Sequence, residues 1–149
     1  MSECKVRERL MEAMKESMRK RNKTRLGIIR LALAELQQVA IDEKNLDDKR
    51  ALAVLDKMVK QRRDSIKQFK SAGRMDLSDK EGLELEILQE FLPEQWSEFT
   101  LVQVVAEAIT EVGAQSMIDM GKVMAIIIPK AQGYADMSVI SNIVKSKLS

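Results

Sequence analysis

Apolar residues recur about once per helical turn along most of this chain. In the first segment they are Val6, Leu10, Met14 and Met18, and charged residues fill most positions between them. This spacing places the apolar side chains on one face of an α-helix. Strands are rich in aromatic and β-branched residues, whereas aromatic residues make up only 3% of this sequence. The sequence therefore predicts an all-α protein.

Four helices are predicted in the first two thirds of the chain, each near residues that usually cap helices. The expected helices are Val6 to Met18, Asn22 or Thr24 to about Ile41, Asn45 or Asp47 to about Ala72 with a stop at Gly73, and a fourth through Leu85, Leu88 and Leu92. The third would be a rod roughly 35–40 Å long. The fourth is expected to begin at Ser78, because Ser78 and Glu81 have the spacing of a capping box.

Pro93 marks the predicted boundary between two domains, because proline disfavours helix at the residue before it and lacks a backbone N–H. Three shorter helices are expected after it: Ser97 or Thr100 to Val112, Ser116 to about Ala131 with a cap at Asp119, and Asp136 or Ser138 to about Leu148. We predict an N-terminal helical domain with one long helix over residues 1–94. A small three-helix tail bundle follows over residues 95–149.

Charge divides the chain in a similar way. Residues 1–76 contain 20 Lys and Arg against 12 Asp and Glu, which gives +8, and residues 77–149 contain 5 against 11, which gives −6. A basic half beside an acidic half indicates different partners for each, and the basic half is the candidate for binding an anion.

A row of basic residues is predicted on the third helix, within an arc of roughly 80° at 100° per residue. Its members are Lys60, Arg63, Lys67, Lys70 and Arg74, and the turn between the first two helices adds Arg21, Lys23 and Arg25. Such rows suit a phosphate backbone. The alternative is a solvated face that pairs with nearby carboxylates. Arg62 differs from its neighbours, because it falls inside the apolar arc and is expected to form a buried or half-buried ion pair.

The sequence shows no catalytic centre. It has no histidine, and its single cysteine, Cys4, has no imidazole to activate it. The acidic cluster Asp79–Glu86 is explained better by the helix dipole than by a metal ion. We therefore expect no catalytic residue, metal site or cofactor. We also expect no membrane span, because the most apolar run, Val123–Pro129, is far too short. A cytoplasmic location is expected because one cysteine cannot form an intrachain disulfide, which fits a reducing compartment.

Several strings along the chain occur together in the same order. They are Lys60–Ser65, Ala72–Leu77, Phe91–Gln95, Gly113–Ser116, Asp119–Met124 and Ala135–Asp136. With these strings the chain resembles the YqeY family, also called GatB/YqeY-domain proteins. The resemblance implies a helical domain followed by a three-helix tail. It also implies kinship to the tail of the B subunit of glutamine-dependent aminoacyl-tRNA amidotransferases, where the tail holds tRNA.

The resemblance implies tRNA and an amidotransferase or aminoacyl-tRNA synthetase as partners, with a carbon–nitrogen ligase label that uses glutamine as amide donor. Glutamine hydrolysis needs an activated nucleophile, so this label can apply only through other subunits. The tail's role carries over to Gly121, Lys122, Lys130, Asp136, Lys145 and Lys147 as tRNA-facing positions. Close helix packing is the competing explanation for Gly121, and helix capping is the competing explanation for Asp136.

Two departures weaken that role of the tail. Tyr134 replaces a basic residue and Met137 replaces a glycine of the family's usual pattern. The expected function is a tRNA-binding accessory protein, with the basic helix as the preferred contact surface. The alternative is a protein-interaction module that uses the Met-rich faces of the tail or the segment around Trp96. The methionines of those faces are Met117, Met120 and Met124.

Overall fold

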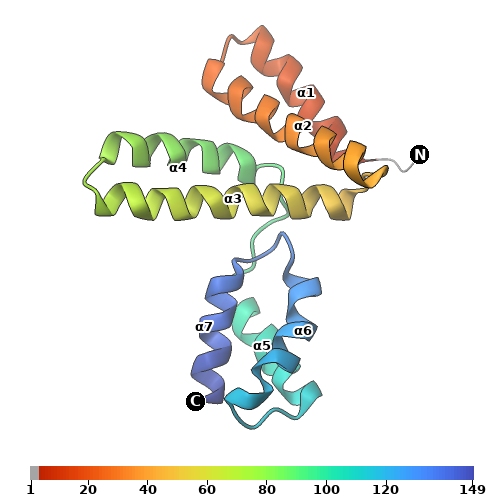
Figure 1. Ribbon diagram of the computed structural model, residues 1–149, viewed down its shortest axis with the longest axis vertical. Helices are drawn as coiled ribbons and strands as arrows, with labels where there is room; N and C mark the ends of the chain where they lie inside the picture. Colours follow the sequence, from red (N-terminus) through yellow and green to blue (C-terminus); the bar gives the residue numbers. More distant parts are fainter. Residues whose placement is uncertain (1–3) are drawn as a thin grey trace. The chain divides into compact units, whose positions relative to one another are not determined.

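The computed structural model describes residues 4–149. Over these residues it contains seven α-helices and one short 3₁₀-helix, and no strand (Figure 1). The predicted all-α class is confirmed. Contacts between residues divide the chain into two compact units, Met1–Pro93 and Glu94–Ser149. Each unit has a hydrophobic core of its own.

The first unit begins with two helices that pack against each other, α1 (Lys5–Arg19) and α2 (Lys23–Glu43). The Asn22 side chain accepts a hydrogen bond from the Arg25 backbone N–H, so Asn22 rather than Thr24 caps α2. The turn between the helices is a Schellman motif, in which the Asn22 N–H donates to Ser17 O and the Arg21 N–H donates to Met18 O. Arg21 has a φ of 54°, so a non-glycine residue holds the left-handed position of this motif.

The next two helices, α3 (Asp48–Ser71) and α4 (Met75–Gln89), lie side by side and make the most extensive helix contact in the chain (Figure 1). The Asp47 side chain accepts from the Arg50 N–H, so Asp47 rather than Asn45 caps α3. Gly73, with φ 71°, ends it in a second Schellman motif, since the Arg74 N–H donates to Phe69 O and the Gly73 N–H to Lys70 O.

The predicted start of the fourth helix at Ser78 is wrong. Helix α4 begins three residues earlier, at Met75, and Ser78 is buried inside it. The Ser78 backbone N–H donates to Arg74 O, so the first helical hydrogen bond is made without a side-chain cap. Because the chain leaves the Schellman turn at Gly73 already directed into the next helix, the capping-box pattern of Ser78 and Glu81 is not used.

The core of the first unit joins all four helices. Its fully buried aliphatic side chains are Leu10 on α1, Ile29 and Leu36 on α2, Leu55 and Val59 on α3, and Leu88 on α4. Phe91 and Leu92, in the segment after α4, close this core. These residues follow the apolar periodicity of the sequence, which is why the periodicity predicts the helices correctly.

The second unit consists of α5 (Glu98–Val112), the 3₁₀-helix η1 (Met117–Asp119), α6 (Met120–Ala131) and α7 (Met137–Leu148). Ser97 caps α5 and Asp136 caps α7, through hydrogen bonds to the backbone N–H groups of Thr100 and Ser138. Asp119 is the N-cap residue of α6, as expected, but its side chain makes no cap bond to α6. Its carboxylate instead accepts from the Gln115 N–H in the preceding loop.

Val105, Val123, Ile127 and Val144 are fully buried in the core of this unit. The segment before α5 is fixed to the turn between α6 and α7. The Trp96 N–H donates to Tyr134 O, and the two rings stack with centroids 5.6 Å apart.

Candidate nucleic-acid interface

Four members of the predicted basic row lie on helix α3, and three of them are exposed to solvent. Lys60, Lys67 and Lys70 are exposed, and Arg63 is half-buried on the same side of the helix. None of the three lysines makes an ion pair with another residue of the described range 4–149. From the helical rise, Lys60 and Lys67 are about 10 Å apart along the axis. The row therefore presents positive charge to solvent over more than two helical turns.

Carboxylates on α4 border one end of this row. Lys70 lines a shallow cavity of about 340 Å³ together with Asp79 and Glu86 of α4. Their negative charge lowers the potential that Lys70 offers to an incoming phosphate. Lys60 and Lys67 do not line this cavity. The two are therefore the strongest phosphate-binding candidates of the row.

The ion pair predicted for Arg62 is confirmed. Its Nε lies 3.4 Å from Glu84 Oε2 and 3.9 Å from Glu81 Oε2, and its side chain is 15% exposed. This Nε is buried and makes no hydrogen bond within the described chain, so the attraction is Coulombic rather than a directed N–H···O bond. The pair joins α3 to α4. Arg62 is therefore a structural residue and lies outside the cationic row.

Arg74, the last member of the predicted row, is the N-cap residue of α4 and is already paired. Its Nε and one terminal nitrogen each donate to an oxygen of Asp76 at 3.2 Å, and both side chains are exposed. This hydrogen-bonded pair lowers the pKa of the Asp76 carboxyl. Phosphate binding at Arg74 would have to compete with Asp76, so Arg74 contributes less than the lysines of α3.

The three basic residues predicted at the first turn are in different environments. Arg21 and Lys23 are exposed. Arg25 is half-buried, pairs with the Glu90 carboxylate, and lies over the Phe91 ring with its guanidinium carbon 5.8 Å from the ring centroid. Arg25 therefore fixes the end of α4 to α2, and of the three predicted residues Arg21 and Lys23 remain as surface cations.

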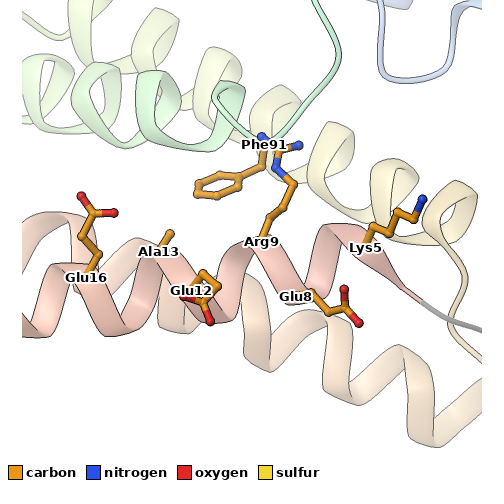
Figure 2. A pocket seen from close by; sticks show the side chains of 7 residues that line it. All are labelled: Lys5, Glu8, Arg9, Glu12, Ala13, Glu16 and Phe91. Atoms are coloured by element: carbon orange, nitrogen blue, oxygen red, sulfur yellow. The ribbon is translucent and has the colours of Figure 1, made fainter.

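A groove runs along α1 beside this contact (Figure 2). It has a volume of about 590 Å³ and is lined by Lys5, Glu8, Arg9, Glu12, Ala13, Glu16 and Phe91. Arg9 donates to the Glu90 carbonyl, and its guanidinium carbon lies 5.7 Å from the Phe91 ring centroid. Figure 2 shows the Arg9 side chain extending from α1 toward Phe91. The groove is shallow and its charges alternate in sign, so it does not form an anion site.

The tail positions carried over from the family resemblance lie on α6 and α7. Lys122 and Lys130 are exposed near the two ends of α6, and Lys145 and Lys147 are exposed in the last turn of α7. Asp136 caps α7. Close packing does not explain Gly121, because a Cβ atom added there would meet no atom within 4 Å. A small residue is therefore not required sterically at this position.

The tail surfaces considered for protein binding are only partly accessible. Met117 is 43% exposed, whereas Met120 and Met124 pack against the core of the second unit. Trp96 is half-buried in its stack with Tyr134. Sequence reasoning missed the most exposed large apolar side chains of this unit, Phe99 and Ile118. Phe99 lies two residues after the cap residue Ser97, and the apolar period does not show whether a residue so near the helix start faces the core or solvent.

Cys4 is buried at the start of α1, and burial raises the pKa of its thiol. The neutral thiol is the less reactive form, so this position does not provide a nucleophile near neutral pH. Within residues 4–149 no group of three or more His, Cys, Asp or Glu side chains is arranged to hold a metal ion.

No single described helix is long and apolar enough to cross a membrane. Helices α5 and η1–α6 reach that length and composition only as a pair, and the pair is bent by 96° at its break.

Comparison with known proteins identifies the family. Residues 7–148 match the family described as Yqey-like protein. An uncharacterised protein of Schizosaccharomyces pombe is 33% identical over 93 residues, which cover 62% of this chain and 72% of that protein. Two proteins named altered inheritance of mitochondria protein 41, mitochondrial, are each 35% identical. The one from Pyrenophora tritici-repentis matches over 82 residues, 54% of this chain and 45% of that protein. The one from Eremothecium gossypii matches over 85 residues, 56% of this chain and 46% of that protein.

This chain thus matches less than half the length of either of the two proteins named altered inheritance of mitochondria protein 41. The match over residues 7–148 spans both units, and the chain belongs to the YqeY-like family.

Proposed function

We propose that this protein is a non-catalytic RNA-binding accessory protein that holds a structured RNA, with tRNA as the first candidate, through the cationic row on α3. The observation that carries the proposal is the exposure of Lys60 and Lys67 on one side of a long helix without ion-pair partners among the described residues. The resemblance to the tail of the amidotransferase B subunit supports tRNA as the RNA. It also supports an amidotransferase or aminoacyl-tRNA synthetase as the associated system.

The chemistry of the row favours contact with the phosphate backbone over base reading. Lysines on a helix neutralise phosphates and release counterions, but they distinguish bases poorly. Single-strand readers need exposed aromatic rings for stacking, and the one aromatic residue of α3, Phe69, is half-buried. A folded RNA, recognised by its shape and backbone, is therefore the expected ligand.

The proposal includes no chemical step by this chain alone. The sequence has no histidine, and its one cysteine is buried with a raised thiol pKa. Amide transfer from glutamine therefore belongs to the proposal only through association with other subunits. A reducing intracellular compartment, the cytoplasm in the first instance, is also part of the proposal. The mitochondrial names of the fungal relatives describe those proteins.

Three double variants with the same net charge test this proposal. They are K60E/K67E on α3, K122E/K130E on α6, and K5E/K80E as a control at exposed lysines outside both candidate surfaces. Each variant changes the net charge from +2 to −2. Binding of unmodified tRNA is measured at several salt concentrations by fluorescence anisotropy, and circular dichroism checks that each variant is folded.

The expected result is a selective loss in K60E/K67E. Each lost phosphate contact reduces the slope of log K against log salt by roughly 0.7–0.9, so two contacts remove about 1.4–1.8. K5E/K80E should keep the wild-type slope, because it has the same change in net charge as K60E/K67E but leaves the row on α3 intact. A loss confined to K122E/K130E would transfer the site to the tail. Equal losses in all three variants would show that only net charge matters, and no tRNA binding at low salt would refute the function.

A further inference from the structure

Helix α5 has a second apolar stripe, formed by residues that do not belong to its buried face. Val105 and Ala108 are buried in the second unit, whereas Phe99, Val102 and Ala106 are exposed. At 100° per residue these three exposed positions fall within an arc of about 60°. The spacing of three and four residues is that of a helix face which packs against another helix.

Phe99 is the most exposed of the aromatic side chains among the described residues. The Phe99 side chain is 77% exposed and Val102 is 38% exposed. By contrast, Phe91 is buried and Phe69 is half-buried. Burying a phenylalanine ring gains roughly 1.5–3 kcal/mol. Single exposed apolar residues are common on protein surfaces, but neighbouring ones on one helix face indicate an interaction surface.

The border of the stripe carries negative charge only. Glu98 lies on one side of it and Glu107 on the other, and Glu111 follows on the next turn. No Lys or Arg occurs between Glu94 and Gly121. This surface therefore repels phosphate backbones and anionic lipid headgroups, and it attracts a cationic partner.

We propose that α5 is the docking site for a basic amphipathic helix of a partner protein. Its apolar side chains would cover Phe99 and Val102, and its flanking Lys or Arg residues would lie against Glu98 and Glu107. This mode combines burial of an aromatic anchor with charge complementarity at the rim. The proposal is independent of RNA binding, because it uses another surface on the other unit.

The test uses two synthetic helical peptides of about 18 residues, which have the same leucine stripe and differ only in Lys or Glu at all other positions. Binding of each labelled peptide to the full chain is measured by fluorescence anisotropy. The expected result is at least about tenfold tighter binding of the Lys peptide, a difference of about 1.4 kcal/mol. F99D/V102D should lose at least about tenfold of that affinity. E107Q/E111Q should weaken binding less and reduce its dependence on salt.

Two further variants act as controls for fold and charge. I41D adds a charge at an exposed apolar residue of α2 and should bind the Lys peptide as the wild type does. F99A removes the ring without adding charge and should also weaken binding. Neither F99D/V102D nor F99A is expected to unfold the tail, because both side chains are exposed and residue 99 lies in the first turn of α5, where Asp is favourable.

Four results would overturn the proposal. Equal affinity for the Lys and Glu peptides would show that charge does not select the partner. Unchanged binding by F99D/V102D would show that the peptide does not bind to the stripe. Self-association in sedimentation equilibrium that F99D/V102D abolishes would assign the stripe to a second copy of the chain. Binding to vesicles with anionic lipid, lost in the same variant, would assign it to a membrane surface. F99D/V102D should still bind tRNA as the wild type does. The docking proposal and the RNA proposal can therefore fail independently of each other.

Discussion

The ion pair between Arg62 and the two glutamates of α4 gives the most direct test of how α3 and α4 are held together. Replacing Arg62 with Met keeps most of the side-chain volume but removes the cation that pairs with both Glu81 and Glu84. The side chains of these residues are 15%, 24% and 18% exposed. Two half-buried carboxylates would then face each other without a counter-charge.

The magnitude follows from distance and exposure. At an effective dielectric constant of 20, charges about 4 Å apart attract by roughly 4 kcal/mol, and desolvation offsets much of this. Breaking a buried pair usually costs about 3–5 kcal/mol, whereas exposed pairs contribute about 0–1 kcal/mol. The partial exposure here, and the missing hydrogen bond at Nε, place R62M at about 2 kcal/mol of lost stability.

Urea denaturation followed by far-ultraviolet circular dichroism measures this loss, with R74M as the matched control at the exposed Arg74–Asp76 pair. R74M should change the free energy of unfolding by less than about 1 kcal/mol. Trp96, the only tryptophan, lies in the second unit and provides a separate fluorescence probe of that unit. The double variant R62M/E84Q should recover part of the loss, because one unpaired carboxylate is removed. A loss in R62M no larger than in R74M would refute the reasoning.

Three further predictions concern single positions. Iodoacetamide should alkylate Cys4 at least about tenfold more slowly in the folded chain than in urea, because burial raises the thiol pKa and blocks access. Gly113→Ala should lower the free energy of unfolding by about 1 kcal/mol and Arg21→Gly should raise it by a similar amount, because both residues have left-handed backbone conformations. Asp76→Asn should reduce the loss of thermal stability between pH 7 and pH 3. Pairing with Arg74 lowers the pKa of Asp76, so its stabilising contribution is present above the ordinary pKa of the carboxyl and is lost as the pH falls through the lowered value.

The sequence predicts the helices well because the apolar period and the caps agree with each other. Asn22, Asp47, Ser97 and Asp136 all accept the expected backbone hydrogen bonds. The capping-box pattern of Ser78 and Glu81 predicted the wrong start for the fourth helix, which begins three residues earlier, at Met75. A Schellman turn at Gly73 already started the next helix, and the hydrogen bonds of that turn depend on a φ of 71° that a capping-box pattern does not reveal.

The candidate sites were harder to predict, because the role of a charged residue depends on its neighbours from other helices. Arg62 could be assigned to an ion pair, since its position in the apolar arc of α3 is set by the helical period alone. Arg25 could not, because Glu90 and Phe91 are 65 or more residues away in sequence and meet it only in the folded unit. The outer stripe of α5 was missed for a related reason. An apolar residue is counted as core until the packing of the helix is known.

The spacing of cations favours α3 over α6 as the proposed surface for RNA. Charges in water at physiological ionic strength act together only within about 8 Å. Lys122 and Lys130 are eight positions apart on α6, or about 12 Å along the axis, so each acts nearly alone. On α3, Lys67 and Lys70 are about 4.5 Å apart along the axis, and Lys60 lies about 10 Å from Lys67. Neighbouring phosphates can therefore be neutralised together on α3 but not on α6. The carboxylates that border α5 add to this difference, because they favour a cationic protein on the tail and oppose a phosphate backbone there.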